Sequence, residues 1–218
     1  RNFAAAAVKS ASLALSSVWK TSPVLPDFLS VHDDPTRTRH DGRTLNGHYR
    51  VDDEGTPAQA VTVIKRGVLK RFLMSRTPAG EQAGSNGHGR AASYKHPVAR
   101  QGVLVVEAHR TVPKAELRKQ LRDAARKQGL EYGLYFDDIS GGFTFTGRWI
   151  PQAFNVMPLM VYRVYVDGRP DELVRGVDLI GTPLTAFSRI RAAGDDTGIF
   201  NGHCGAESGW VPVSAVTA

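Results

Sequence analysis

AVTVIKRGVLKRFLMS, residues 60–75, contains two apolar runs on either side of a short polar turn. The first run, 61–64, is rich in β-branched residues, which favour strands. The turn at Lys65, Arg66 and Gly67 suits a tight hairpin, because glycine readily adopts the positive φ angle that such turns require. We therefore expect an antiparallel β-hairpin here.

The segments around this hairpin extend the same pattern. GVLVVEA (102–108) is an apolar run with the length of a buried strand, and EQAGSNGHGRAAS (81–93) is typical of a glycine-rich loop. Residues 134–147 and 155–181 alternate and turn like antiparallel strands, with DGRP (167–170) as a hairpin turn. The chain is therefore expected to contain a dominant antiparallel sheet.

Helical patterns occur in three segments, which are 1–22, 111–133 and 182–196. In the second, Leu117 and Leu121 are spaced to lie on one helix face, and Gly129 follows the last turn. The third is expected to end at Gly194. These patterns predict an α+β fold in a single domain over 1–218, with a helical lead-in at 1–22. We expect a predominantly antiparallel, barrel-like sheet and about three helices.

Composition limits the class of protein. The chain has 218 residues, of which 41% are hydrophobic, so it can bury a substantial core. It has one cysteine and therefore no internal disulfide, which weakly favours the cytoplasm without excluding export. Its apolar stretches are shorter than the roughly 20 residues of a membrane span, so we expect no membrane insertion.

The charge is uneven along the chain. Residues 1–130 carry 22 Lys and Arg against 11 Asp and Glu, and residues 131–218 carry 6 against 10, so the two parts have net charges of +11 and −4. A basic region can attract nucleic acid. Neither a basic groove with interleaved aromatic residues nor a nucleic-acid-binding motif accompanies it, so a solvated basic face is the preferred interpretation and nucleic acid is not an expected partner.

Cys204 is the residue with the most open interpretation. It lies in NGHCG (201–205), next to His203 and Gly205. A thiolate is both a nucleophile and a soft metal ligand, whereas a free cysteine is most often a small buried side chain. Glycines around it favour a functional position, because they allow tight backbone bends and leave room for a metal or substrate.

Other candidates have plainer interpretations. His32, His40 and His48 recur every eight residues, a spacing that matches no common zinc pattern, so these histidines and His88 are expected at the surface. Three consecutive acids at 52–54 precede a Gly-Thr-Pro turn and are expected to cap it. Phosphate-loop, nucleophile-elbow and dinucleotide-binding motifs do not occur in the sequence.

Seven segments together resemble the C-terminal region of the TldD/PmbA family, the metallopeptidases also called modulators of DNA gyrase. They are DDPT (33–36), GHYRVDDEGTPAQ (47–59), GVLKRFLMSR (67–76), SNGHGR (85–90), ELVRGVDLIGTPL (172–184), AAGDD (192–196) and NGHCGAESGWVPVS (201–214). The combination, in this order, is more specific than any one segment.

The resemblance implies a zinc site and a peptide-binding cleft. Active family members hold zinc with two histidines of an H-E-x-x-x-H helix, whose glutamate is the general base, and with a cysteine near the C-terminus. Cys204 corresponds to that cysteine, and His203 is not expected to be a ligand. The family segments that border the cleft correspond to Asn86, Gly87, Arg90, Asn201 and Gly205, which are expected to shape the site and bind an extended peptide substrate.

The helix motif itself does not occur in the chain, because 1–20 contain neither His nor Glu. We expect either a fragment of a longer protein or a version that has lost its zinc helix, and prefer the fragment. The expected function is the C-terminal domain of a zinc-dependent peptidase acting on peptides or unfolded segments, inactive by itself. It would form a homodimer or a heterodimer with a family member. The alternative is a non-catalytic peptide-binding subunit.

Overall fold

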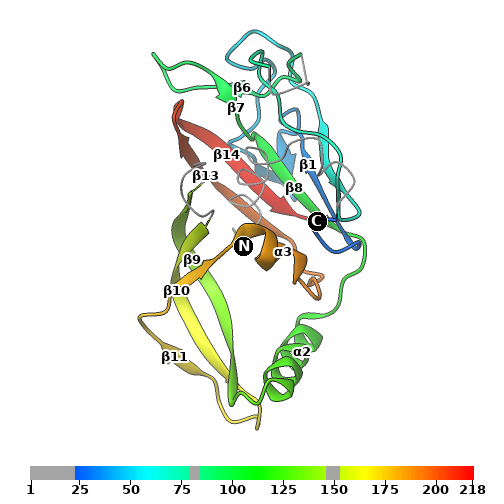
Figure 1. The fold of residues 1–218 in the computed structure, drawn as a ribbon, viewed down its shortest axis with the longest axis vertical. Coiled ribbons are helices and arrows are strands. Elements are labelled where there is room, and N and C mark those ends of the chain that lie inside the picture. Colours follow the sequence, from blue (N-terminus) through cyan, green and yellow to red (C-terminus); the bar gives the residue numbers. More distant parts are fainter. Residues whose placement is uncertain (1–22, 79–83, 146–152) are drawn as a thin grey trace.

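The fold was analysed in a computed structural model that describes residues 23–78, 84–145 and 153–218 (Figure 1). In chain order the elements are β1 (Leu29–Asp33), β2 (Arg39–His40), β3 (Arg43–Thr44), β4 (Val61–Lys65), β5 (Val68–Leu69), β6 (Gly89–Arg90), β7 (Val98–Ala99), β8 (Val103–Ala108), α2 (Lys114–Lys127), β9 (Tyr132–Phe145), β10 (Ala153–Tyr165), β11 (Glu172–Val174), β12 (Leu179–Gly181), α3 (Pro183–Ser188), β13 (Gly198–Ala206) and β14 (Gly209–Thr217). The helical lead-in expected at 1–22 lies outside the described residues.

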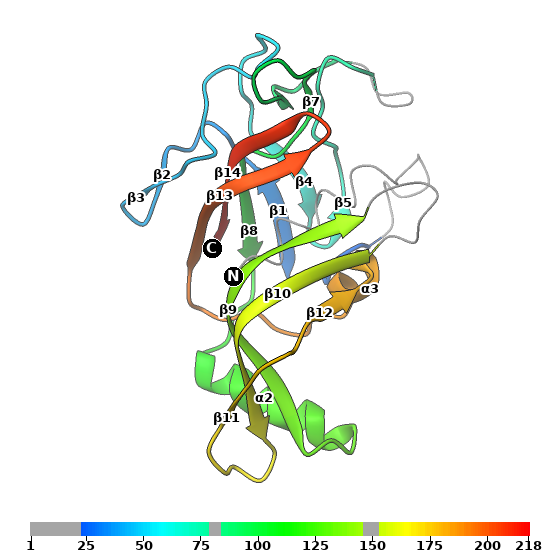
Figure 2. The ribbon, with the colours of Figure 1, turned by 90° about the vertical axis from the view of Figure 1, so that its left-hand side faces the viewer.

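The largest sheet has six strands in the order β13-β14-β8-β1-β4-β5 (Figure 2). Its neighbouring strands are antiparallel, apart from the parallel pair β14 and β8. The sheet is open, with β13 and β5 at its two edges among the described strands. The α+β class and the antiparallel sheet are thus confirmed, whereas barrel-like closure is not.

The hairpin expected at 60–75 is formed by β4 and β5. Arg66 and Gly67 both have positive φ angles, of 45° and 79°. The Gly67 N–H donates to the carbonyl of Leu29, and its own carbonyl accepts from the Val24 N–H. The turn therefore also anchors the chain that enters β1.

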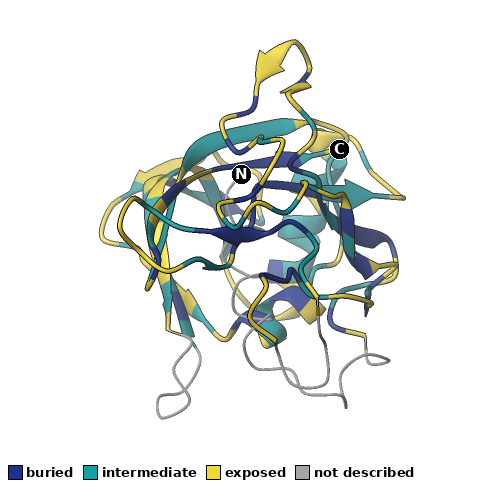
Figure 3. Cartoon of the chain, turned by 90° about the horizontal axis from the view of Figure 1, so that it is seen from above, coloured by how far each residue is buried: buried dark blue, intermediate teal, exposed yellow. Residues whose placement is uncertain are grey.

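The six-stranded sheet has buried side chains on both faces. Successive side chains of a strand point to opposite sides, and both members of such a pair are buried on β8. On β8, Leu104 packs on one face with Val31 and Ala215, while Val103 packs on the other with Val216. Leu104 and Val103 have no exposed surface. Figure 3 shows buried residues toward the middle of the molecule and exposed residues on its outer segments. Burial of each such side chain contributes about 1.5–3 kcal/mol.

The long hairpin of β9 and β10 is the centre of a second sheet, in which β11 and β12 pair with the other edge of β10. It extends away from the six-stranded sheet, and α2 lies beside its far end (Figure 1). The helix confirms the expectation from 111–133, and Gly129, with φ 70°, follows it. A Cβ at Gly133 of β9 would lie only 2.5 Å from Cδ1 of Leu121. The glycine therefore lets the helix pack closely against the strand.

The third expected helix, at 182–196, is shorter than predicted. α3 ends at Ser188, well before Gly194. The Val112 N–H donates to the carbonyl of Ala193, and the Asp195 N–H donates to the carbonyl of Val112, so tertiary pairing holds this segment extended. Of the three expected helices, the described residues contain these two. Neither is long and apolar enough to cross a membrane.

Gly67→Ala tests the hairpin turn against a matched glycine. A Cβ at Gly67 would lie 2.3 Å from the backbone oxygen of Leu25, whereas a Cβ at Gly42, which has a similar φ of 74°, would meet nothing within 4 Å. We expect Gly42→Ala to lower the free energy of unfolding by about 1 kcal/mol, from backbone strain alone, and Gly67→Ala to lower it by more than about 2 kcal/mol. Urea unfolding measures both, and equal losses would contradict this assignment.

Candidate functional site

Cys204 lies near the end of β13, the edge strand of the large sheet. Its register partner on β14 is Val211, so the two side chains share a face. Val211 is buried, but Cys204 is only partly buried, and its Sγ has one weak contact, 3.9 Å from the carbonyl oxygen of Gly205. Its same-face neighbours on β13 are Gly202 and Ala206. Cys204 is therefore a partly buried residue rather than a fully buried core residue.

The glycines beside Cys204 have a different role from the one expected from sequence. A Cβ at Gly202 would lie 2.3 Å from Cζ of Phe200, and a Cβ at Gly205 would lie 3.0 Å from Cε2 of Trp210. Aromatic rings already fill the space over both glycines. The glycines thus let the rings of Phe200 and Trp210 pack closely against the hairpin.

Two buried arginines hold the β13–β14 hairpin from the side, and we call Arg90 and Arg100 the arginine clamp. Pairing of β14 with β8 begins only at Ser214, and the clamp contacts the part of the hairpin nearer its turn. Arg90 donates to the carbonyl of Pro212 at 2.6 Å and to that of Gln101 at 3.0 Å. Burial lowers the pKa of Arg90, and its guanidinium lies 4.7 Å from the ring centroid of Tyr49.

Arg100 is the member of the clamp that reaches Cys204. Its guanidinium donates to the carbonyl oxygen of Cys204, to Oγ of Ser208 at 2.7 Å and to the carbonyl of Gly209 at 3.1 Å. Only 3% of Arg100 is exposed. No sequence pattern distinguishes Arg100 from other basic residues, so sequence reasoning missed it.

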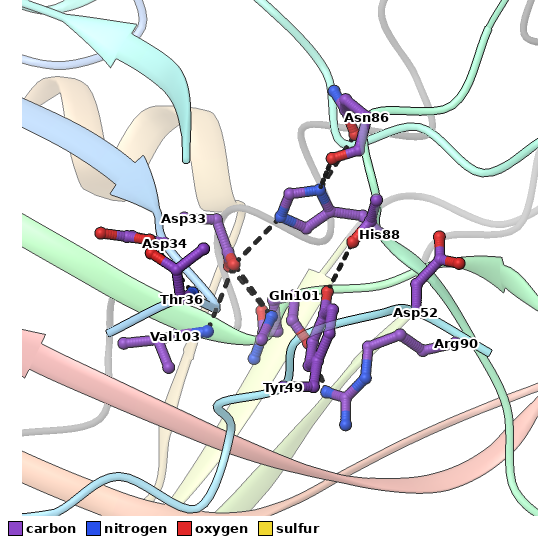
Figure 4. Close-up of polar contacts among 12 residues, drawn as sticks. Asp33, Asp34, Thr36, Tyr49, Asp52, Asn86, His88, Arg90, Gln101 and Val103 are labelled. Atoms are coloured by element: carbon purple, nitrogen blue, oxygen red, sulfur yellow. Dashed lines mark hydrogen bonds and ion pairs between the residues drawn. The ribbon is translucent and has the colours of Figure 1, made fainter. Parts of the chain in front are cut away.

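The arginine clamp contacts a buried polar cluster built around Asp33 (Figure 4). Asp33 is fully buried at the end of β1, and its carboxylate accepts from the backbone N–H groups of Gly102 and Val103 at 3.0 to 3.2 Å. Nε2 of the fully buried His88 lies 3.2 Å from Oδ1 of Asp33. The surface position expected for His88 is wrong, because this ring joins β1 to the glycine-rich segment.

The glycine-rich residues expected to bind substrate are held by contacts inside the chain. Asn86 accepts from the Met74 N–H at 2.7 Å and donates to the Phe72 carbonyl at 2.9 Å. Gly87, with φ 77°, places its carbonyl where the Tyr49 hydroxyl donates to it at 2.9 Å. The substrate-binding role of Asn86, Gly87 and Arg90 remains a prediction, and the polar groups of the Asn86 and Arg90 side chains bond within the chain.

Asn201 is similarly occupied farther along β13. Its Oδ1 accepts from Oγ of Ser214 at 2.6 Å and from the Asn46 N–H at 3.0 Å, and its Nδ2 donates to the Thr44 carbonyl at 2.8 Å. Asn201 therefore fastens a loop to the edge strand. A substrate role for Asn201 and Gly205 would use the backbone of β13, and it too remains a prediction.

The remaining candidates are structural. Asp52 accepts from the backbone N–H groups of Glu54 and Thr56, which supports the expected turn. His40 is only 7% exposed, so its expected surface position is wrong, whereas His48 is exposed and His32 is partly buried against Glu107. Within 23–78, 84–145 and 153–218, no group of three His, Cys, Asp or Glu side chains is arranged to hold a metal.

Tyr49→Phe tests the electrostatics of the cluster. Burial, and then the negative charge of Asp33, raise the pKa of Tyr49 well above its usual 10.0. Because the folded state holds this proton more tightly than the unfolded state, the associated stability is complete below pH 10. It is lost above pH 10 by up to about 1.4 kcal/mol per pH unit. The free energy of unfolding, measured with urea from pH 8 to 11, should fall less steeply with pH for the Phe variant than for the wild type. Parallel pH dependences of the two proteins would contradict the assignment.

Gly202→Ala and Gly205→Ala test the packing of the hairpin. The Phe200 ring over Gly202 also packs on the main core, so it cannot move freely, whereas Trp210 is 69% exposed and can shift. We expect Gly202→Ala to lower the free energy of unfolding by about 1–3 kcal/mol and Gly205→Ala to be nearly neutral. Chemical denaturation checks the order, and the reverse order would refute it.

Comparison with known proteins identifies the chain's relatives. The family model described as the PmbA/TldA metallopeptidase C-terminal domain matches residues 2–217. A metalloprotease of Archaeoglobus fulgidus is 28% identical over 193 residues, covering 88% of this chain and 40% of that protein. A metalloprotease TldD homolog of Haemophilus influenzae is 30% identical over 180 residues, covering 77% and 33%.

Solved structures agree on the fold. TldE from Thermococcus kodakarensis superposes with a TM-score of 0.60 at 13% identity, covering 97% of this chain and 44% of that one. A Thermotoga maritima protein whose name links it to modulation of a DNA gyrase gives 0.59 at 19% identity, covering 97% and 43%. The chain thus spans two fifths or less of the length of the two curated relatives above. Because the family model matches nearly the whole length of the chain, the chain belongs to the TldD/PmbA metallopeptidase family and corresponds to the C-terminal domain of that family.

Proposed function

We propose that this chain is the C-terminal domain of a zinc-dependent peptidase that acts on peptides or unfolded segments. Cys204 supplies one zinc ligand, and the H-E-x-x-x-H helix comes from outside this chain. The observation that supports this most is the placement of Cys204, a partly exposed thiol on an edge strand whose backbone a buried arginine holds. The metalloprotease names of relatives such as the Archaeoglobus protein agree with it.

The donor chemistry at Cys204 fits zinc as part of a larger ligand set. Cysteine thiolate and histidine nitrogen are preferred zinc ligands, and catalytic sites use three protein ligands. The described part of the chain supplies no three-ligand group, so the two histidines of the proposal belong to another segment or subunit. Bound zinc would supply the Lewis acidity that polarises a peptide carbonyl and activates water.

The edge position of β13 suits an extended peptide. Among the described strands, β13 lies at the edge of the sheet and pairs only with β14. A peptide placed along this edge strand would pass the Cys204 position. The side chain of Asn201 is already bonded to Thr44 and Asn46, so it would set the shape of this edge rather than read the peptide sequence.

The proposal includes a cytoplasmic location and a second subunit, either another copy or a family member. A non-catalytic peptide-binding subunit is the alternative function. One observation favours it, the lack of a three-ligand group within the described residues. In that case the same β13 edge would hold the peptide and Cys204 would bind no metal.

Cys204→Ala and the neighbouring His203→Ala distinguish the two functions. The chain is produced with an H-E-x-x-x-H helix of the family, in one polypeptide or as a partner subunit, and zinc is measured by elemental mass spectrometry. We expect near one zinc per site in the wild type and in His203→Ala. In Cys204→Ala, the affinity for zinc should fall by more than the roughly 10–100-fold that is typical when a residue supporting a ligand is removed. Peptide hydrolysis should be lost.

The chain by itself should bind zinc far below one equivalent. Unchanged zinc and activity in Cys204→Ala would refute the ligand assignment. Absence of zinc from every sample would support the non-catalytic alternative.

A further inference from the structure

The strongest unassigned feature beside Cys204 is Arg100. Its side chain is almost completely buried, and every polar contact described for it goes to the β13–β14 hairpin: the Cys204 carbonyl, Ser208 Oγ and the Gly209 carbonyl. A buried guanidinium is costly unless its donors are satisfied. Arg100 is therefore committed to this one hairpin.

The hairpin end has no strand pairing with β8, so beyond its own β13–β14 ladder it is held by Arg100 and by the Ala92 N–H, which donates to the Ser208 carbonyl at 2.8 Å. The parallel ladder between β14 and β8 runs from Ser214 to Thr217. The preceding part of β14, and the whole of β13, gain no support from β8. Arg90 and Arg100 bond to the backbone of this part of the hairpin. Of the two, only Arg100 bonds to β13.

The Cys204 carbonyl is the atom through which a thiol direction can be set. It belongs to the rigid peptide plane between Cys204 and Gly205. Cys204 and Gly205 pair with Val211 and Trp210 in the β13–β14 ladder, which already restrains this plane. The guanidinium bond to the Cys204 carbonyl adds a side-chain restraint to that ladder at the residue that carries the thiol.

We propose that Arg100 is a positioning residue for the metal site, which fixes the Cys204–Gly205 peptide plane so that the thiol points toward the ligand position. The inference rests on the proposed function, in which Cys204 binds the metal. Lysine cannot replace it, because the contacts on three acceptors use the planar fork of arginine. The glycine-rich segment is thereby coupled to the thiol, since the Arg100 N–H donates to the His88 carbonyl at 2.8 Å.

The first test observes Cys204 directly and needs no metal. Cysteine labelled with ¹³C at Cβ gives one NMR signal, because the chain has one cysteine. In Arg100→Met we expect this signal to broaden or move toward its unfolded position. Arg90→Met is the matched control, because it removes a buried guanidinium that bonds Pro212 and not Cys204. It should leave the signal close to that of the wild type.

Arg100→Lys is a second variant for the case in which Arg100→Met does not fold, because lysine keeps the positive charge at this position. Circular dichroism and urea unfolding confirm that each variant is folded. We expect the Cys204 signal of Arg100→Lys to be perturbed as well, although less than in Arg100→Met. A wild-type signal in both folded Arg100 variants would overturn the proposal.

The second test measures the metal, with Cd²⁺ as the probe, in the protein combined with the H-E-x-x-x-H helix. The thiolate-to-cadmium absorption band reports binding at Cys204 itself. We expect Cd²⁺ affinity to fall about 10–100-fold in Arg100→Met and less than about threefold in Arg90→Met, as for other residues that orient a ligand. Equal affinities in the wild type and Arg100→Met would overturn the proposal.

The two tests separate failure of the inference from failure of the proposed function. If the wild type gives no thiolate-to-cadmium band, Cys204 is not a metal ligand and the proposed function fails. The NMR comparison then still decides whether Arg100 orients the Cys204 thiol.

Discussion

The buried carboxylate of Asp33 is the constraint on which the region around Cys204 depends. A buried charge without partners would cost several kcal/mol, so Asp33 must have its hydrogen-bond donors in place. They are the backbone N–H groups of Gly102 and Val103 at the start of β8, and His88 of the glycine-rich segment lies at the same carboxylate. One side chain therefore fixes β1, β8 and a long loop relative to one another.

Fixing that loop also fixes the arginine clamp. His88, Arg90 and Arg100 lie close together because the Arg100 N–H donates to the His88 carbonyl and β6 pairs with β7. Both guanidinium groups then reach the β13–β14 hairpin where strand pairing with β8 is missing. A chain of polar contacts thus runs from the core of the sheet to the backbone of Cys204.

This arrangement gives the edge strand that carries Cys204 contacts outside its own hairpin. Edge strands lack the support of a second neighbour, yet they offer free backbone groups to an added strand. The clamp contacts the hairpin from the side of β14, and β13 is the edge strand of the sheet among the described strands.

By itself the sequence determined the local elements with strong patterns: the hairpin around Gly67, the buried strand of β8, the helix α2 and the family segments that include Cys204. These follow from side-chain periodicity and turn chemistry, which act over a few residues. Only the tertiary structure decided that the sheet stays open, that α3 ends at Ser188, and that His88 and Arg100 are buried. Those outcomes depend on partners far along the chain, such as Val112 for the segment after α3 and Cys204 for Arg100, and no local pattern encodes such contacts.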